Sequence, residues 1–303
     1  MSITKGLRLP VLVAPMFLVS GVEMVVAAAR AGVLGAFPTP NCRTAAELDR
    51  WMAEVAARVE GRPWAVNVIT HSSNPRLADD LALIAKYRPP VLITALGSPA
   101  AAVATAHGYG GMVMADVPNV ALARKALAAG ADGLACLAAG AGGHTGSLSP
   151  FAFVSAVRRF HRGPLSIGGG IGDGAGIAAA LAAGADMACM GTHFIACDES
   201  LAGSDYKQAV VAAGLEDIVL SDRVTGTMAS WLRASLAAAG YLADDGSTPN
   251  RNYEAGAAAG RWRDIWSAGQ GVGAIRHTAP LETIIDELEA EYREVVLRLP
   301  KMM

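Results

Sequence analysis

The sequence predicts an α/β fold, a closed (β/α)8 barrel with a mostly helical C-terminal insertion that covers the barrel mouth. Eight short apolar segments lie between residues 11 and 190, and helical segments separate them. Strands that are apolar on both faces and alternate with helices are typical of a parallel sheet. Eight such units fit a closed barrel better than an open sheet. The sequence Ala-Ala-Gly-Ala-Asp occurs at 128–132 and at 182–186, in both places between a helical segment and a strand, as repeated βα units would have it.

The eight predicted strands are short, mostly apolar segments. In chain order they are Val11–Ala14, Val33–Phe37, Trp64–Ile69, Val91–Ala95, Gly111–Ala115, Gly133–Leu137, Leu165–Ile167 and Met187–Met190.

Several helices carry start or stop signals. A helix over Glu23–Arg30 ends before Gly32. Thr44 followed by Glu47 is a capping-box pattern and predicts a helix that continues to about Val59. Ser149 is expected to cap a helix whose first residue is Pro150, and Gly130 to end a helix that starts at Val120.

The pattern of alternating strands and helices ends near residue 200. We predict that 1–220 and 276–303 form the barrel with its C-terminal helix, and that 221–275 is a helical and loop insertion near the active site. The segment Asp244–Asn250 is rich in turn residues. The last helix, Pro280–Arg298, is amphipathic because its apolar residues keep helical spacing.

Composition excludes several classes of protein. The chain has 303 residues, a net charge of −2 and no basic run, which argues against a nucleic-acid partner or an anionic membrane surface. Its four cysteines form no CxxC and no zinc-ligand spacing, so we expect no metal and a reduced, cytoplasmic setting. No signal peptide is visible, and no apolar run of about 18 residues predicts a membrane span.

The active site of such a barrel lies at the C-terminal ends of its strands. Glycines follow the seventh and eighth strands, and backbone N–H groups there, with a helix N-terminus, are suited to a phosphate. The candidate phosphate ligands are Gly168, Gly169, Gly170, Gly191 and Thr192. A tight turn needs glycine too, so a plain turn is the alternative.

Two polar residues near strand ends are further candidates. Asn67 offers a donor and an acceptor that could hold a heterocycle, or it satisfies loop backbone groups. Asp116 either bonds a ribityl hydroxyl of a cofactor or caps the helix after Pro118.

His144 is the candidate catalytic residue. It follows the sixth strand on a turn that contains Gly142 and Gly143, and it has no charged neighbour in sequence. A histidine in such a place donates, accepts or takes a proton near neutral pH, or it is a structural hydrogen-bonding residue. His71, His107, His161 and His277 lie in polar contexts and are expected to be solvated or structural, and His193 to bond locally.

These motifs together resemble the nitronate monooxygenase family, formerly 2-nitropropane dioxygenases, which are FMN-dependent TIM barrels related to the flavin-dependent enoyl-acyl carrier protein reductases. The resemblance is carried by Ala14-Pro15-Met16, Val66-Asn67, Ala141-Gly142-Gly143-His144, Gly169-Gly170-Ile171-Gly172-Asp173-Gly174, Met190-Gly191-Thr192-His193-Phe194 and Ala268-Gly269-Gln270-Gly271.

The resemblance implies FMN as cofactor, with roles for particular residues. Ala14, Pro15 and Met16 would contact the flavin, and Asn67 would bond the isoalloxazine. Gly169, Gly170, Gly191 and Thr192 would hold the phosphate. His144 would act as base or as hydrogen-bond donor to a nitronate.

The chain also departs from the family pattern. The family often reads Gln-Gly-x-Glu-Ala-Gly-Gly-His, whereas this chain has Leu137 to His144 without the Gln and the Glu. Where the fifth strand ends in Lys in many members, this chain has Asp116.

The function expected from the resemblance is oxidation of nitronates or nitroalkanes by O2 to a carbonyl compound and nitrite. The partners are then this small substrate and O2, with a homodimer as the candidate assembly. Met16, Phe17 and either Trp231 or Trp266 would supply an apolar pocket. Two alternatives stay open: an FMN- and NAD(P)H-dependent reductase of the enoyl- or quinone-reductase kind, and a flavin-free phosphate-binding barrel.

Overall fold

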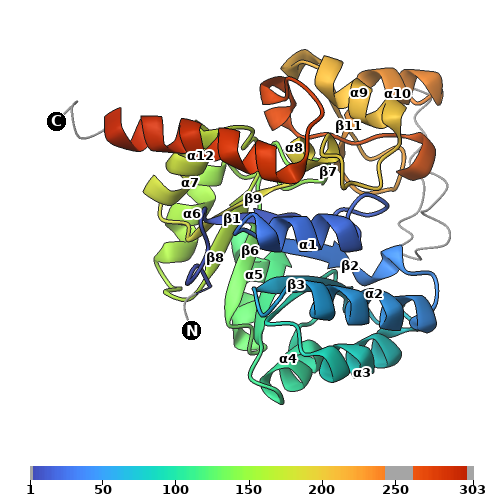
Figure 1. Ribbon diagram of the computed structural model, residues 1–303, viewed down its shortest axis with the longest axis vertical. Helices are drawn as coiled ribbons and strands as arrows, with labels where there is room; N and C mark the ends of the chain where they lie inside the picture. The colour runs from blue at the N-terminus through green and yellow to red at the C-terminus, as the bar shows by residue number, and fades with distance from the viewer. Residues whose placement is uncertain (1–2, 243–261, 299–303) are drawn as a thin grey trace.

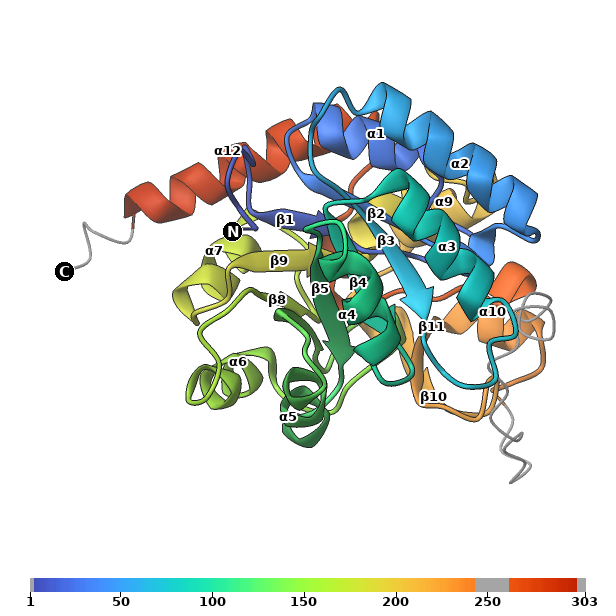
Figure 2. The same cartoon turned by 90° about the horizontal axis from the view of Figure 1, so that it is seen from below.

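Eight parallel strands close into a barrel in a computed structural model, which describes residues 3–242 and 262–298 (Figures 1 and 2). The strand order around the barrel is β1-β2-β3-β4-β5-β6-β8-β9, which confirms the predicted fold. Each predicted strand is present: four have the predicted bounds, and the ends of the other four shift by one or two residues. The strands are β1 Val11–Val13, β2 Leu34–Pro38, β3 Trp64–Ile69, β4 Val91–Ala95, β5 Met112–Val117, β6 Gly133–Leu137, β8 Leu165–Gly168 and β9 Met187–Met190.

Side chains alternate between the two faces of each strand, which explains why the strands are apolar throughout. In β1, Val11 and Val13 face outward into the layer between strands and helices, whereas Leu12 faces the barrel interior. The interior is filled by residues such as Leu34, Ile93 and Met114, so the barrel is a packed core below its mouth.

Helices cover the outside of the barrel, as predicted. They are α1 Val22–Arg30, α2 Ala45–Arg58, α3 Leu77–Tyr87, α4 Ala100–His107, α5 Val120–Ala128, α6 Pro150–Arg158, α7 Gly174–Ala182, the short α8 Thr192–Ile195, α9 Ser204–Ala212 and α12 Leu281–Arg298.

The predicted helix starts are confirmed in position. At α2, Thr44 Oγ1 accepts from the Glu47 N–H at 3.1 Å. The Glu47 carboxylate accepts from the N–H of Arg43 rather than from that of Thr44, so the capping box is displaced by one residue. Ser149 occupies the N-cap of α6 and Pro150 its first turn, but the Ser149 side chain makes no capping hydrogen bond.

The segment after residue 212 contains a small sheet that the sequence did not indicate. Strands β10 (Ile218–Ser221) and β11 (Ala229–Leu232) pair antiparallel, and β11 also pairs with β7 (Gly143–His144). The 3-10 turn η2 (Leu215–Asp217) precedes this sheet, α10 (Arg233–Ala238) follows it, and η3 (Gln270–Ala274) lies further on. The turn-rich segment at 244–250 lies outside the described residues.

The long helix α12 packs across α7 and α1, and its C-terminal turns extend past the body of the barrel in Figure 1. Its buried face is Leu281, Ile284, Ile285 and Leu288, at the predicted helical spacing. Among the helices of residues 3–242 and 262–298, none combines the length and apolarity that crossing a bilayer requires.

Candidate functional site

The loop after β1 is held in place by two buried polar side chains. Ser20 Oγ accepts from the N–H of Met16 at 2.9 Å and donates to Ala14 O at 3.1 Å. Asn41 Nδ2 donates to Met16 O at 3.1 Å and to Ser20 O at 2.7 Å. Asn41 Oδ1 accepts from the N–H of Leu18, whose φ is +62°, at 2.8 Å. The loop that carries Ala14, Pro15 and Met16 is therefore rigid where it faces the mouth.

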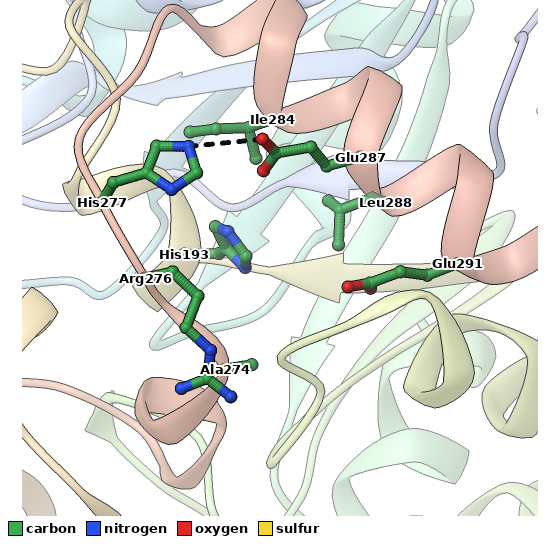
Figure 3. Close-up of a pocket in the computed structure, with 8 residues that line it drawn as sticks. All are labelled: His193, Ala274, Arg276, His277, Ile284, Glu287, Leu288 and Glu291. Atoms are coloured by element: carbon green, nitrogen blue, oxygen red, sulfur yellow. Dashed lines mark ion pairs between the residues drawn. The ribbon is translucent and has the colours of Figure 1, made fainter.

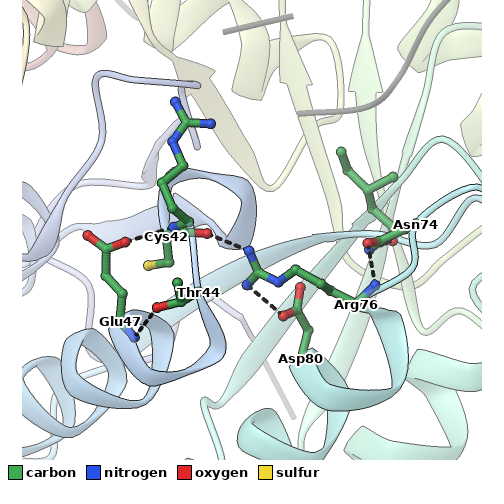
Figure 4. A network of polar contacts seen from close by, with 8 residues as sticks. Cys42, Thr44, Glu47, Asn74, Arg76 and Asp80 are labelled. Atoms are coloured by element: carbon green, nitrogen blue, oxygen red, sulfur yellow. Dashed lines mark hydrogen bonds and ion pairs between the residues drawn. The ribbon is translucent and has the colours of Figure 1, made fainter. Parts of the chain in front are cut away.

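Asn41 ends the 3-10 turn η1 (Thr39–Asn41). The next residue, Cys42, belongs to the network in Figure 4, where Arg76 Nη1 donates to its carbonyl at 2.6 Å. Because Arg76 follows β3, this bond ties the loop after β2 to the loop after β3. Arg76 also pairs with Asp80 at 2.9 Å, while burial raises the pKa of the Asp80 carboxyl. Asn74 Nδ2 donates to Ile69 O and so fixes the loop after β3 to the end of its own strand.

Asn67 faces the barrel interior from the middle of β3, because its neighbours Val66 and Val68 face outward. Its Nδ2 donates to Ile93 O of β4 at 3.2 Å. Within the described residues no group donates to Oδ1, so the side chain keeps an acceptor for a ligand while the strand holds it in orientation.

Asp116 also faces the interior, near the end of β5, and it is not a helix cap. Asn119 caps α5, because its Oδ1 accepts from the N–H of Leu122 at 2.9 Å. Asp116 is half-buried as a residue, and the protein atoms around its carboxyl desolvate it and raise its pKa to about 7.

A glycine-rich segment near the C-terminus lies directly on the loop after β6. An added Cβ at Gly142 would stand 2.8 Å from the N–H nitrogen of Gly269, and one at Gly269 would stand 2.6 Å from Gly140 O. Two backbones meet here without side chains between them, which explains the glycines. The N–H groups of Gln270 and Gly170 both donate to Gly140 O, at 2.8 and 3.1 Å.

The two predicted phosphate loops lie together beside the β1 loop. A Cβ at Gly191 would meet Met16 Sδ at 3.1 Å and Ala14 Cβ at 3.4 Å. Thr192 Oγ1 accepts from the N–H of Gly269 at 2.9 Å, which leaves the hydroxyl hydrogen to donate elsewhere. Gly170 has φ +69° and open space where a Cβ would be.

The N-terminus of α7, which was expected to face the phosphate, already binds two carboxylates. The Gly174 N–H donates to Glu291 of α12 at 2.8 Å, and the Gly176 N–H donates to the N-cap Asp173 at 2.7 Å. The expectation that the first turn of this helix offers free donors is therefore wrong at these two positions, because side chains satisfy them.

Behind the phosphate loops, a cavity of about 50 Å³ separates His193 from α12 (Figure 3). His193 Nδ1 lies 2.7 Å from Gly172 O and donates to it, which confirms the expected local bond. Burial lowers the pKa of His193. His277 pairs with Glu287 across the same cavity at 3.3 Å. Among residues 3–242 and 262–298, no three His, Cys, Asp or Glu side chains converge as a metal site.

His144 differs from the other described histidines. His71 contacts Ser73 Oγ, His107 contacts Asp132, His161 contacts Pro164 O and His277 contacts Glu287. The Nε2 atom of His144 is buried and has no hydrogen-bond partner among the described residues. Burial lowers the pKa of His144, so its imidazole is neutral at neutral pH.

Among the described residues, the aromatic ring next to His144 is that of Trp262 rather than that of Trp231 or Trp266. The two rings meet edge to face at 5.5 Å, and Trp262 packs in turn on Trp231 at 4.5 Å. Trp231 is fully buried and its indole N–H donates to Ser221 O. Trp266 stacks instead on Tyr206 of α9.

Sequence reasoning thus missed Ser20, Asn41 and Trp262. Asn41 and Ser20 do not lie at strand ends, where the sequence search looked for site residues. Trp262 lies in the C-terminal segment, and the position of that segment over the mouth depends on the pairing of β7 with β11. The glycine segment at 268–271 was recognised only through the resemblance, and its backbone contact with the β6 loop was not expected.

The four cysteines are free. Burial raises the pKa of Cys42, Cys136, Cys189 and Cys197 to about 12 in each case, so all four are neutral thiols rather than reactive thiolates.

Comparisons with known proteins agree with this geometry. The family model for nitronate monooxygenase matches residues 71–291. A nitronate monooxygenase from Paraburkholderia phytofirmans is 28% identical over 72% of this chain, and the match spans 65% of that relative's length. A (3aS,4S,5R,7aS)-5-hydroxy-7a-methyl-1-oxo-octahydro-1H-indene-4-carboxyl-CoA dehydrogenase from Mycobacterium tuberculosis is 31% identical over 76% of this chain and 65% of its own length.

The structure of a nitroalkane oxidase from Streptomyces ansochromogenes superposes with a TM-score of 0.84. It covers 99% of this chain and 100% of its own length at 26% identity. These relatives are oxidoreductases by name, and the family match from residue 71 to residue 291 includes the loops after β5, β6, β8 and β9 and the 268–271 segment. The chain is therefore an oxidoreductase that belongs to the nitronate monooxygenase family, a flavin-dependent family.

Proposed function

We propose that this protein binds FMN at the barrel mouth and oxidises nitronates or nitroalkanes with O2. In the overall reaction two substrate molecules consume one O2: each C–N bond breaks, one atom of the O2 becomes each carbonyl oxygen, and each nitrogen leaves as nitrite. The observation that carries the proposal is the buried, unpartnered Nε2 of His144 beside the glycine loops. A neutral imidazole in a water-poor site is suited to a substrate that carries an acidic C–H or an anionic nitro group.

The residues around the mouth fit a flavin. Ala14, Pro15 and Met16 form a rigid loop for its ring, and Asn67 Oδ1 is a free acceptor among the described groups. Asp116 offers a polar contact near the end of β5. The open space at Gly170 and the hydroxyl of Thr192 are suited to a phosphate, with Gly168, Gly169 and Gly191 beside them. Gly142 also lies beside Thr192, because an added Cβ there would stand 3.1 Å from Thr192 Oγ1, and Gly143 lies next to Trp262.

When bound, FMN supplies the electron-accepting and oxygen-reactive group. The chain's own contribution is acid–base and steric. His144, neutral because of burial, removes the proton α to the nitro group of a nitroalkane, or donates its N–H to the oxygens of a nitronate. Trp262 and the 268–271 segment shield the reacting centre from water.

The absorbance spectrum of the purified protein and nitrite release from a small alkyl nitronate test this proposal. His144→Asn is expected to retain flavin and to lose at least about 100-fold in turnover of the nitroalkane, with a smaller loss for the preformed nitronate. His277→Asn, at an exposed ion pair outside the mouth, is the matched control. Unchanged nitroalkane kinetics in the His144 variant would contradict the role of base, and a colourless protein that takes up no FMN would refute the flavin site.

A second candidate is a flavin-dependent reductase that takes electrons from NAD(P)H. The similarity to a dehydrogenase of a CoA ester and the absence of the family's Gln and Glu before His144 favour it. Anaerobic mixing separates the two candidates. Rapid bleaching of the flavin by NADH or NADPH supports the reductase, and a spectral change only with the nitronate supports the oxidation proposed above.

A further inference from the structure

Two unpartnered polar side chains face the barrel interior along one row of the sheet. In register, Asp116 of β5 lies beside Ala135 of β6, and Ala135 lies beside Ser166 of β8. The neighbours of these residues along each strand face outward, as Leu134, Cys136, Leu165 and Ile167 do in the outer apolar layer. Strand alternation therefore directs Asp116 and Ser166 inward, with only the methyl group of Ala135 between them.

Both side chains lack the partners that buried polar groups normally have. Ser166 is fully buried, and its Oγ has no hydrogen-bond partner among residues 3–242 and 262–298. No described residue donates to or accepts from the Asp116 carboxyl. More than nine in ten buried polar groups in native proteins are paired, so the orphaned Ser166 Oγ on the same row as the half-buried, unpartnered Asp116 carboxyl indicates a missing ligand.

The surroundings favour the protonated carboxyl. Among the described residues, Cys189 on β9 faces the interior together with Asp116, whereas Cys136 on β6 lies close to Asp116 but faces the outer layer; both thiols are neutral. His144, at the mouth, is neutral too. Neighbouring β4 presents Thr94 and Ala95 and carries no charge at this level. Nothing stabilises a carboxylate here, and burial alone accounts for the rise in the pKa of Asp116.

We propose that Asp116 and Ser166 form a donor subsite on the inner wall of the mouth, in which the neutral Asp116 carboxyl donates a hydrogen bond to a carbonyl or anionic oxygen of the bound ligand. The oxygen belongs either to the isoalloxazine carbonyls of the flavin or to the nitro group of the substrate. This inference rests on the proposed function for the identity of the ligand. It goes beyond that function because it makes Asp116 a hydrogen-bond donor that is lost when its carboxyl ionises.

The first test uses the ligand-free protein and compares Asp116→Asn with the wild type at about pH 5.5 and about pH 8. A carboxyl with a raised pKa binds a proton in the folded state that the unfolded chain releases, so wild-type stability falls as pH rises from about 4 through about 7. Asn cannot ionise. We expect Asp116→Asn to gain in melting temperature relative to wild type at the higher pH, and Asp205→Asn, exposed on α9, to track the wild type. Equal pH dependence in the wild type and Asp116→Asn would overturn the proposal.

The second test uses FMN titration and steady-state kinetics with the nitronate. Asp116→Leu removes the donor and is expected to weaken binding of the contacted ligand by roughly tenfold at the lower pH. Asp116→Asn keeps an N–H donor, so it is expected to lose less than Asp116→Leu and to show no fall in affinity between the two pH values. Ser166→Ala is expected to weaken the same ligand by a few fold.

The two sources of the oxygen give different results. A change in the Kd of FMN places the flavin on the subsite, and a change in the KM of the nitronate with an unchanged Kd of FMN places the nitro group there. Two results together would overturn the proposal: Asp116→Asn loses as much affinity as Asp116→Leu, and the affinity of the wild type rises with pH. They would mean that an ionised Asp116 carboxylate accepts a hydrogen bond from the ligand. The wild type could release no nitrite while the expected changes in FMN affinity and in melting temperature are still observed. In that case the nitronate is not the substrate, but the donor subsite at Asp116 and Ser166 is supported.

Discussion

Replacing Asn41 by alanine tests whether the β1 loop is held by the network described above. The change removes three hydrogen bonds, to the N–H of Leu18 and to the carbonyls of Met16 and Ser20. Asn41 is only 8% exposed, so bulk water does not replace its amide directly. Met16 O still accepts from the Ser20 N–H, which leaves two backbone groups without a described partner.

An unpaired buried backbone group costs about 1–3 kcal/mol, and water that enters the space of the lost amide recovers part of this. We therefore expect a loss of about 3 kcal/mol in the free energy of unfolding, measured by urea denaturation of the ligand-free protein. Because FMN would then have to order the loop, its Kd is expected to rise about tenfold in a fluorescence titration.

Tyr109→Phe is the matched control, because the Tyr109 hydroxyl donates to Pro89 O at 3.0 Å in loops that precede β5 and β4, at the end of the barrel opposite the mouth. This variant should lose about 1 kcal/mol and leave the Kd of FMN unchanged. A loss below about 1 kcal/mol in Asn41→Ala, together with unchanged FMN affinity, would refute the view that this network positions the loop.

Other predictions follow from single contacts. Gly174→Ala would place a Cβ 2.2 Å from the Tyr292 nitrogen and is expected to lose about 3 kcal/mol of stability, with faster hydrogen exchange in α12; wild-type exchange rates would contradict the tight packing. His144 has a lowered pKa, so it stays neutral in the folded protein while the unfolded chain takes up a proton below about pH 6.5, and stability is lost as pH falls through that value. His144→Asn should therefore lose less stability than wild type between about pH 7 and about pH 5, and parallel melting curves would argue against a buried neutral imidazole. Thr44→Ala should cost about 1 kcal/mol through loss of the α2 cap, and an unchanged midpoint in urea would mean that water replaces this cap.

The sequence by itself was sufficient to predict the barrel, because the signals are local. Continuous apolar segments such as Trp64–Ile69 form strands that are buried on both faces, and Thr44 and Ser149 mark helix starts within one turn. The glycine loops after β8 and β9 also followed from the sequence, since the position of an active site in this fold depends on strand order alone.

The tertiary structure decided how the mouth is completed. His144 lies in a strand because Ala229, which follows much later in the chain, pairs with it. Glu291 occupies the N-terminus of α7 from 117 residues away, and Asn41 holds a loop 25 residues before it in the chain. Each of these contacts joins segments that are distant in sequence and leaves no periodicity or capping pattern near either partner. The sequence therefore determined the barrel and the edge where the site lies, and only packing between distant segments determined which side chains enclose His144 and which polar groups remain free for a ligand.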